Sequence, residues 1–331
     1  MNTFDIVIPT FNRRVFIDRA INSIQNQKYA NWNLFILDNA STDNTNDFVK
    51  EFLCDKIHYV RNESNIGMVR NWYKALTEIG DEKYIVLLGD DDELGEEFLF
   101  KANEAINQFP SLGMYSSATY INNEGKISDW KYEYFDEIDE DYHVSLPGKN
   151  LHYFLGGNPV SPAAIMIKRD CFKTISDSYL QATVAWAFDR YWWAQIALKY
   201  PMVFCSAPTT TYHQHSQSET SNISKNKFDQ LCQEFRVTAN ILNMAFNLEL
   251  VSIDTIKFEI GKLKHQKQLD VLCSLVLFGR KELNDFALQY FVVNNKFLLS
   301  KTESLPTKMA YKIWESRLYH TSECLIVESK C

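Results

Sequence analysis

Three consecutive aspartates follow a short apolar run and are the most informative group of side chains in the sequence. The run is Tyr84 to Leu88, and Gly89 separates it from Asp90, Asp91 and Asp92. Adjacent carboxylates repel one another, at a high cost unless a cation neutralises them. Oxygen ligands of this kind favour Mg²⁺ or Mn²⁺. The other interpretation, that Asp92 caps the following helix, stays open for an isolated triplet, but the position after a strand favours a cation.

A cation held by one or two carboxylates keeps positions for substrate phosphates, which points to a nucleotide or diphosphate ligand. The sequence has no G-x-x-x-x-G-K-[ST], and the turn after Ile6 to Pro9 has no glycine, so neither a P-loop nor a dinucleotide fingerprint is present. Asp38 could accept a hydrogen bond from a base or ribose, Phe11 could offer an aromatic face and Arg70 could meet a phosphate. An Asx turn, a core aromatic and a solvated helix charge are the respective alternatives.

Short β-branched or aromatic runs alternate with helical patterns from residue 1 to about 120. The runs are Phe4 to Pro9, Asn33 to Leu37, Ile57 to Val60, Tyr84 to Leu88 and Met114 to Tyr120. Between them, apolar residues recur at i, i+3, i+4 and i+7, as in Ile17, Ala20, Ile21 and Ile24. This alternation predicts a mostly parallel α/β sheet covered by helices. The polar loops that follow the strands then converge on one rim, where such sheets bind ligands.

The pattern changes after residue 120. We expect a surface excursion from Asn122 to Asn150, because a turn signal is followed there by an acidic run. Ala163 to Ile167 predicts a strand, about Trp186 to Lys199 a helix and His213 to Asn226 a polar loop. From residue 226 the pattern is purely helical. The prediction is an α/β domain over residues 1–225, with halves at about 1–120 and 121–225, and a helical region over 226–331.

The helical region carries a basic run made of Lys257, Lys262, Lys264 and Lys267. Such a run could rest on an anionic membrane, and ordinary helix solvation or packing against a second copy are the alternatives. The stretch from Val271 to Gly279 is about half the length needed to cross a bilayer, so we expect no transmembrane helix.

Length and composition bound the remaining classes. With 331 residues, about two domains are expected, and 46% apolar residues can fill sizeable cores. The formal net charge of −8 disfavours a nucleic-acid partner. Seven cysteines without a C-x-x-C pair suggest neither a zinc ribbon nor a disulfide framework, and the N-terminus lacks the features of a signal peptide. The expected location is cytoplasmic.

Taken in order, four segments resemble the family 2 glycosyltransferases of the GT-A fold, which move a sugar from a nucleotide diphosphate to an acceptor. The resemblance covers about residues 1 to 220. The segments are Ile6 to Arg13, similar to the family's opening strand and loop; Leu37 to Asp43, similar to its second-strand nucleotide motif; Asn65 to Gly67 with Arg70 and Asn71, similar to the stretch before its metal strand; and Leu88 to Asp92, similar to its D-x-D-type metal site.

The resemblance implies how the first half binds the donor. Phe11 and Asp38 would hold the nucleobase. The neighbouring Thr10 and Arg13, together with the helix residue Arg70, would also contact the donor. Asp90 would approach the ribose or the donor sugar, and Asp91 would ligate the metal. Gly89 stands where many members have the first carboxylate of D-x-D, so the metal ligand is Asp91 or Asp92.

The resemblance also implies a general base and a further metal residue in the second half. Asp189 occupies the base position, although Phe188 replaces the acidic residue that usually precedes it. Aromatic neighbours would raise the pKa of Asp189, as a base requires, whereas a helix N-terminal aspartate is the structural alternative. His215, in Tyr212-His213-Gln214-His215, would help to bind the metal or the diphosphate, with a solvated histidine as the alternative.

These implications describe an inverting, Mn²⁺- or Mg²⁺-dependent glycosyltransferase. Its donor would be a nucleotide diphosphate sugar, with a UDP-sugar preferred, and its acceptor a saccharide or lipid-linked saccharide in bacterial surface polysaccharide, O-antigen or capsule assembly. The protein would be cytoplasmic or peripheral at the inner face of the membrane. A catalytically weak nucleotide-sugar-binding or scaffold protein is the alternative, because Gly89 and Phe188 both replace family carboxylates.

Overall fold

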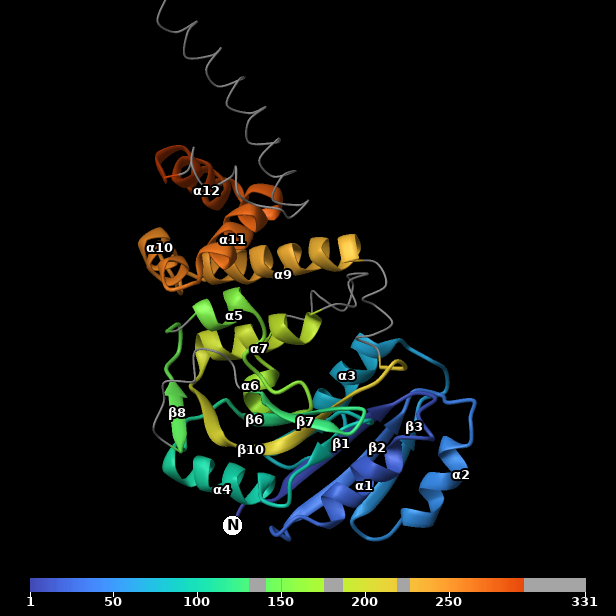
Figure 1. Cartoon of the computed structure of the whole chain (residues 1–331). Helices are drawn as coiled ribbons and strands as arrows, with labels where there is room; N and C mark the ends of the chain where they lie inside the picture. The colour runs from blue at the N-terminus through green and yellow to red at the C-terminus, as the bar shows by residue number, and fades with distance from the viewer. Residues whose placement is uncertain (131–140, 150, 176–186, 219–226, 295–331) are drawn as a thin grey trace, which may run out of the picture. The chain divides into compact units, whose positions relative to one another are not determined.

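The computed structural model describes residues 1–130, 141–149, 151–175, 187–218 and 227–294 (Figure 1). They fall into two compact units, one of residues 1–150 and 158–223, the other of residues 151–157 and 224–331. The first unit is built on a mixed sheet with the order β3-β2-β1-β4-β9-β6-β10-β5, in which β7 pairs with β6 and β8 with β10. A mixed α/β sheet with flanking helices is the predicted fold class.

The strands of the sheet have the following bounds: β1 Phe4–Thr10, β2 Trp32–Asp38, β3 Ile57–Arg61, β4 Tyr84–Leu88, β5 Glu93–Leu94, β6 Met114–Asn123, β7 Lys126–Trp130, β8 Tyr142–Ser145, β9 Ala164–Lys168 and β10 Met202–Gln214. The first four run parallel to one another. β9 is antiparallel to both β4 and β6, and β10 returns parallel to β6. All five runs predicted before residue 120 are strands, as is the one predicted near Ala163.

Helices cover both faces of this sheet. Their bounds are α1 Ile17–Gln25, α2 Thr45–Val49, η1 Lys50–Phe52, α3 Met68–Thr77, α4 Phe98–Gln108, α6 Arg169–Phe172 and α7 Phe188–Lys199. The apolar stripes of α1 and α4 pack on one face, in a core that contains Ile6, Val86 and Met166. On the other side, aromatic rings join α3, α6 and α7, with Trp192 against Phe172 at 5.5 Å. Figure 1 shows these two layers of helices.

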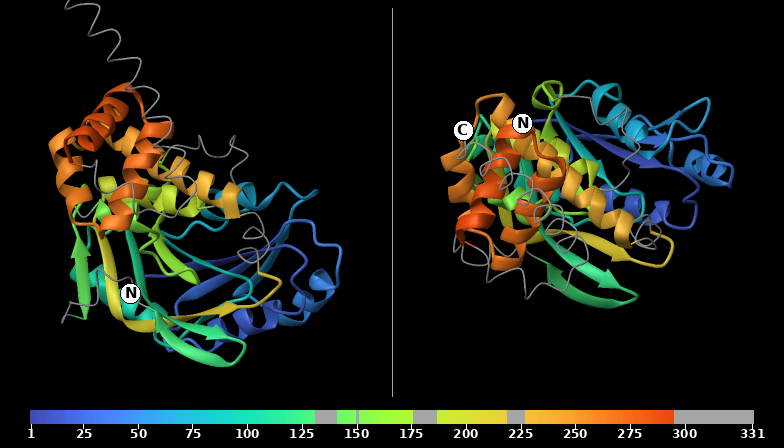
Figure 2. Two further views of the ribbon diagram at one scale, coloured as in Figure 1. Left: turned by 45° about the horizontal axis from the view of Figure 1, so that its top comes forward. Right: turned by 90° about the horizontal axis from the view of Figure 1, so that it is seen from above.

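Two segments differ from the sequence-based expectation. The excursion expected from Asn122 to Asn150 contains β7 and β8, and Figure 2 shows the β6–β7 hairpin extending from the sheet as a two-stranded ribbon. The loop expected from residue 213 begins inside β10, a 13-residue strand. Pro208 interrupts the apolar pattern of β10 and coincides with a shift in its register against β6, which is why the pattern did not predict a strand.

Buried hydroxyl groups, rather than apolar side chains, fix the later half of β10. Thr119 donates to Ser161 at 2.6 Å and lies 2.8 Å from the hydroxyl of Thr210. Thr209 donates to Ser117 at 2.9 Å. Because each buried hydroxyl has a partner, the network holds β10 against β6 in one register. That register decides which residues of β10 reach the loops after β4.

The second unit is helical. It consists of α5 His152–Gly156, α9 Lys227–Asn247, α10 Ile253–Gly261, α11 His265–Phe278 and α12 Lys281–Asn294. Its core includes Ile241, Leu242, Leu272 and Leu275, each fully or nearly fully buried. The helical pattern predicted after residue 226 is confirmed as far as residue 294. A search of the described helices finds none with both the length and the apolar character needed to traverse a bilayer.

Candidate active site

The acidic residues after β4 form a tight turn that begins at Gly89. The backbone N–H of Asp92 donates to the carbonyl of Gly89 at 3.2 Å, and Gly89 N–H donates to Ala163 at 3.0 Å. A Cβ atom at position 89 would lie 2.5 Å from Oδ2 of Asp92. A side chain at position 89 would therefore displace the Asp92 carboxylate, and the carboxylates that the turn offers are those of Asp90, Asp91 and Asp92.

Strand β10 brings two histidines onto this turn. β5 pairs with β10 antiparallel, with Glu93 opposite Thr211, so His213 and His215 extend along the acidic residues. Nε2 of His215 lies 3.0 Å from Oδ2 of Asp91, and both side chains are largely buried, at 17% and 15% exposed. The His215 ring also stacks on Phe16, with the ring centroids 4.3 Å apart. Asp91 and His215 thus present one oxygen and one nitrogen ligand side by side.

His213 and Asp92 serve a different purpose from their neighbours. Oδ1 of Asp92 accepts a hydrogen bond from the backbone N–H of His213 at 2.8 Å, and Asp92 is 2% exposed. Nε2 of His213 lies 2.6 Å from Oε1 of Glu93. These contacts tie β10 to the acidic turn. Among the described residues, no group of three or more His, Cys, Asp or Glu has metal-binding geometry.

The negative charge of the turn exceeds the positive charge that the protein supplies. Burial and, next, the neighbouring charge of Asp91 raise the pKa of Asp90 to about 7. The Thr10 hydroxyl, the Arg13 charge and the Phe11 backbone N–H favour the charged form of Asp90 but offset the rise only in part. Burial, followed by the charge of Asp91, also raises the pKa of Asp92 well above its usual range.

Two arginines reach the turn, and only Arg13 was predicted. Nε of Arg13 lies 3.9 Å from Oδ1 of Asp90, and its Nη1 donates to the carbonyl of Gln217 at 2.7 Å. Arg19, on α1, donates through Nη2 to the carbonyl of Asp91 at 2.7 Å. The sequence places Arg19 on a helix but does not show that this helix packs beside the loop after β4. The contact of Arg19 with the acidic turn could therefore not be predicted.

The loop after β2 is built around Asp38. Its carboxylate is fully buried and accepts hydrogen bonds from Ser41 N–H at 2.9 Å, the Tyr59 hydroxyl and Arg61 Nη1 at 2.7 Å. Ala40 in the same loop has a φ of 64°, in the left-handed region. With both oxygens bonded within the protein and no exposed surface, Asp38 shapes the loop from below rather than facing its outer surface.

The remaining donor candidates differ in exposure. Thr10 is buried beside the acidic turn, whereas Phe11, directly after it at the end of β1, is 39% exposed. Arg70 is exposed on α3, and within the described part of the chain no ion pair joins it to the acidic turn. The structure therefore brings together Thr10, Phe11, Arg13 and the acidic turn, and it leaves Arg70 apart from their contacts.

Asp189 lies in the first turn of α7. The preceding residue, Ala187, has a left-handed φ of 56°, and Oδ2 of Asp189 accepts a hydrogen bond from Asn158 at 2.8 Å. Phe188 is buried, with its ring 4.9 Å from that of Trp192. The amide of Asn158 thus orients a half-buried carboxylate that stands beside an aromatic core. Trp186 lies outside the described residues.

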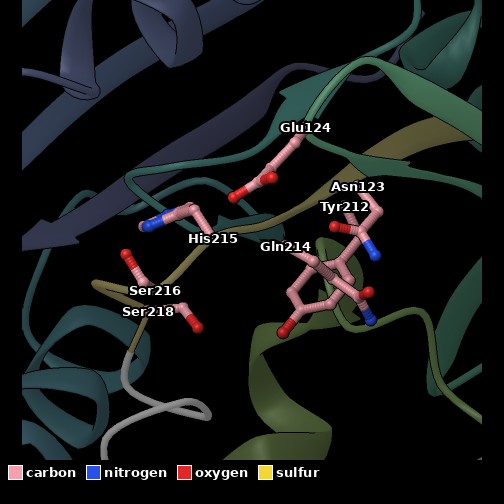
Figure 3. Close-up of a pocket in the computed structure, with 7 residues that line it drawn as sticks. All are labelled: Asn123, Glu124, Tyr212, Gln214, His215, Ser216 and Ser218. Atoms are coloured by element: carbon pink, nitrogen blue, oxygen red, sulfur yellow. The ribbon is translucent and has the colours of Figure 1, made fainter.

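His215 also lines a pocket of about 350 Å³ next to the acidic turn (Figure 3). Two of the other lining residues, Asn123 and Glu124, come from the β6–β7 hairpin, and the rest come from the end of β10 and the loop after it. Every lining residue has a polar side chain. Neither the hairpin nor its pairing with β10 was anticipated, so this pocket had not been predicted.

Comparisons with known proteins agree on one family. The model of Glycosyl transferase family 2 matches residues 5–176, more than half of the chain. The match contains the acidic turn and ends before Asp189 and His215.

Two curated relatives are bacterial enzymes. The abequosyltransferase RfbV of Salmonella typhimurium is 35% identical over 97 residues, which are 28% of this chain and 29% of that protein. The GalNAc(5)-diNAcBac-PP-undecaprenol beta-1,3-glucosyltransferase of Campylobacter jejuni is 34% identical over 97 residues, 28% of this chain and 31% of that protein. The chain thus spans about a third of the length of the curated relatives it matches.

Solved structures share the fold over nearly the whole chain. S. aureus TarS 1-349 in complex with UDP-GlcNAc has a TM-score of 0.59 at 14% identity and covers 96% of this chain and 92% of its own. The mannosyltransferase PcManGT of Pyrobaculum calidifontis, in complex with GDP-Man and Mn²⁺, has a TM-score of 0.54 at 14% identity and covers 98% and 81%. At this identity the likeness establishes the fold alone.

Proposed function

The chain belongs to glycosyl transferase family 2, and from that premise we propose that it transfers a sugar from a nucleotide diphosphate sugar to a hydroxyl of a saccharide or lipid-linked saccharide in bacterial surface-polysaccharide assembly. The observation that carries the proposal is the pairing of Asp91 with His215 in an acidic turn whose carboxylates outnumber the two arginines that reach it. Such a turn is suited to a divalent cation that also holds a diphosphate.

The residues fit Mn²⁺ or Mg²⁺ as the cofactor. Asp91 and His215 would hold the ion, with the donor phosphates completing its ligands, and Asp90 would face the ribose or the donor sugar. When bound, the ion would neutralise the charge of the nucleoside diphosphate leaving group. The raised pKa of Asp90 supports a cation at this turn, because it indicates negative charge that the protein's own cationic side chains do not neutralise.

The chain's own residues would bind and orient the nucleotide. We propose that Phe11, exposed at the end of β1, stacks on the base, while Asp38 holds the loop that borders it. Arg13 bridges Asp90 and the loop after β10, which fixes the edge of the donor site. Arg70 remains a proposed phosphate contact. A UDP-sugar is the proposed donor, in keeping with the TarS complex with UDP-GlcNAc.

Asp189 is the proposed general base. Its carboxylate would take the proton from the acceptor hydroxyl as that oxygen attacks the sugar from the face opposite the leaving group, and this single displacement inverts the anomeric centre. The hydrogen bond from Asn158 fixes the carboxylate for this role. Residues 1–225 form the proposed catalytic domain.

The helical region over 226–331 is proposed to rest on an anionic membrane surface, which would place the protein at the inner face of the cytoplasmic membrane. Phe258 on α10 is 66% exposed and lies under the Lys262 ammonium, 4.6 Å from the ring centroid. An exposed aromatic ring beside lysines suits the interface of such a membrane. Flotation with anionic vesicles tests this, and a protein that stays at the bottom of the gradient contradicts it.

The test of the function measures nucleoside diphosphate release from a panel of nucleotide sugars, with Mn²⁺ or with EDTA. Release that depends on Mn²⁺ is expected, and a scaffold or binding protein releases none. Asp189→Asn should reduce transfer about a thousandfold while the donor still binds. Asp170→Asn is the matched control, since Asp170 also lies in the first turn of a helix but is 80% exposed. Ordinary turnover by Asp189→Asn would exclude Asp189 as the base.

A further inference from the structure

The pocket beside His215 has a composition that suits a sugar ring. Its lining side chains are two amides, three hydroxyls, one imidazole and one carboxylate, namely Asn123, Gln214, Tyr212, Ser216, Ser218, His215 and Glu124. Amides and hydroxyls both donate and accept hydrogen bonds, as the hydroxyl groups of a sugar do. The volume of about 350 Å³ lies at the lower end of the range for small-molecule sites and accommodates one hexose ring.

The charge of the lining separates two classes of sugar. None of the seven lining residues is lysine or arginine, and Glu124 contributes a carboxylate. Arg13 reaches the same loop through the carbonyl of Gln217 but does not line the pocket. A sugar that carries a carboxylate or a phosphate would therefore meet the like charge of Glu124, with no lysine or arginine among these seven described lining residues to offset it. An uncharged ring meets only hydrogen-bonding partners.

The backbone holds Glu124 in a fixed place at the tip of the β6–β7 hairpin. Asn123 pairs with Lys126, so Glu124 and Gly125 form a two-residue turn in which both φ angles are positive, at 50° and 93°. Oδ1 of Asn122 accepts a hydrogen bond from the N–H of Gly125 at 2.8 Å, which closes the turn. Asparagine, aspartate and glycine are the residues that this turn prefers, so turn propensity does not account for glutamate.

The side chain of Glu124 faces His215, one of the two proposed cation ligands (Figure 3). Figure 3 shows its carboxylate directed into the pocket toward His215, whose Nε2 contacts Asp91. A ring in the pocket would therefore contact His215, one of the two proposed cation ligands. Two carboxylate oxygens can accept hydrogen bonds from two neighbouring hydroxyls of a sugar at once.

We propose that this pocket is a subsite for one uncharged sugar ring of the reaction, and that Glu124 is its specificity-determining residue. Glu124 binds two adjacent hydroxyls of the ring and excludes rings that carry a carboxylate or a phosphate. The inference rests on the proposed function, since the ring belongs either to the donor or to the acceptor of the transfer. The experiment distinguishes these two sources.

Binding is measured first, because it does not require turnover. Saturation-transfer NMR on the full chain uses the methyl glycosides of glucose, galactose and N-acetylglucosamine, with methyl glucuronide as the charged analogue. The wild-type protein should bind at least one neutral glycoside and should not bind the glucuronide. Glu124→Lys should reverse this preference. Equal signals from the neutral and charged rings, no neutral ring bound, or an unchanged preference in Glu124→Lys would each overturn the proposal.

Kinetics with UDP-sugars and glycoside acceptors identify the source of the ring. Glu124→Gln should raise the KM of one substrate about tenfold or more, with a smaller change in kcat, because a hydrogen bond to a charged group is lost. A higher donor KM places the donor sugar in the pocket, and a higher acceptor KM places the acceptor there. If neither KM changes, Glu124 does not select the sugar.

Glu249→Gln is the matched control. Glu249 is also an exposed glutamate with a left-handed φ, at 56°, but it lies in the helical unit, and its replacement should alter neither KM. Failure of the proposed function is recognised separately. If the wild-type protein releases no nucleoside diphosphate from any donor, the transferase assignment fails, while the binding preferences still decide the role of Glu124.

Discussion

Two regions of the molecule bury carboxylates beside histidines, and they treat the negative charge in opposite ways. In the helical unit, Glu259 on α10 accepts hydrogen bonds from the ring and backbone N–H of His152, and from Lys262 at 2.7 Å. Burial alone would raise the pKa of Glu259, but the hydrogen bonds from His152 and Lys262 outweigh it and lower the pKa to about 2. This carboxylate is satisfied inside the protein.

The acidic turn after β4 lacks such compensation. Burial and the Asp91 charge raise the pKa of Asp90 to about 7, although Arg13, Thr10 and Phe11 favour its charged form. The difference teaches how to separate the two kinds of buried acid. A carboxylate whose charge is met within the fold supports structure, whereas a group of carboxylates that the fold leaves short of positive charge is a candidate site for a cation from outside.

The strongest test of this comparison replaces the proposed cation ligand. Asp91→Asn should reduce Mn²⁺-dependent transfer about a thousandfold, which corresponds to roughly 4 kcal/mol of transition-state stabilisation. Asp92→Asn should cost about tenfold, because Asp92 acts through the backbone of His213 and not on the cation. Rates and Mn²⁺ titrations of both variants check this. Equal losses in the two variants would show that the ligand register is different.

The second test uses pH. The folded pKa of Asp90 lies above that of an unfolded aspartate, so the folded state binds more protons between about pH 4 and pH 7. In EDTA, stability should therefore fall as the pH rises through this window, by at most about 1.4 kcal/mol for each pH unit from Asp90. Asp92, whose pKa is also raised, adds to this fall. Mn²⁺ should flatten the slope, because the cation replaces the proton. Melting temperatures measured from pH 4.5 to pH 7.5 report the slope.

The control for this pH dependence is Asp90→Asn, which should reduce the slope in EDTA and leave the part that the raised pKa of Asp92 contributes. A variant with the wild-type slope would mean that Asp90 does not contribute to it. In that case the contrast between the two regions would lose its main support.

The third test applies the same linkage to Glu259, with the opposite sign. Its folded pKa of about 2 lies below that of an unfolded glutamate, so its stabilising effect is complete above about pH 4.5 and is lost as the pH falls toward 2. Glu259→Gln should cost the helical unit about 3 kcal/mol at pH 7 and reduce its loss of stability in acid. Urea unfolding at pH 7 measures the loss of stability, and urea unfolding repeated in acid measures how much less stability the variant loses there. Metal should change neither of them.

The sequence predicted the first half of the fold well, for a physical reason. Strands such as Tyr84 to Leu88 are buried on both faces and therefore read as continuous apolar runs, and the loops that follow them necessarily meet at one rim. The acidic turn and the aromatic Phe11 could be found by this argument alone. Asp38 was also found, but its position beneath the loop depends on Tyr59 and Arg61, which come from another strand.

The second half of the site could not be predicted from local pattern. β10 is held by buried hydroxyls around Thr210 and contains Pro208, so it lacks the apolar alternation that identifies a strand. Its register alone brings His213 to Asp92 and His215 to Asp91. Glu124 was hidden for the same reason: its turn was visible in the sequence, but the strand pairing that directs it to the pocket was not.

The smallest expected effect distinguishes the role of His213, near the end of β10, from that of His215, directly after it. His215→Gln should weaken Mn²⁺ binding about tenfold, since the amide oxygen is a poorer ligand than the imidazole and the ring stacking on Phe16 is lost. His213→Gln should leave Mn²⁺ affinity nearly unchanged, because the backbone N–H that holds Asp92 remains and only the contact with Glu93 is altered. Isothermal titration with Mn²⁺ and UDP compares the two. Because His213 lies near the end of β10, His215 directly follows that strand and both contact acidic side chains, a larger loss in His213→Gln would mean that positioning of the strand, and not direct ligation by His215, limits cation binding.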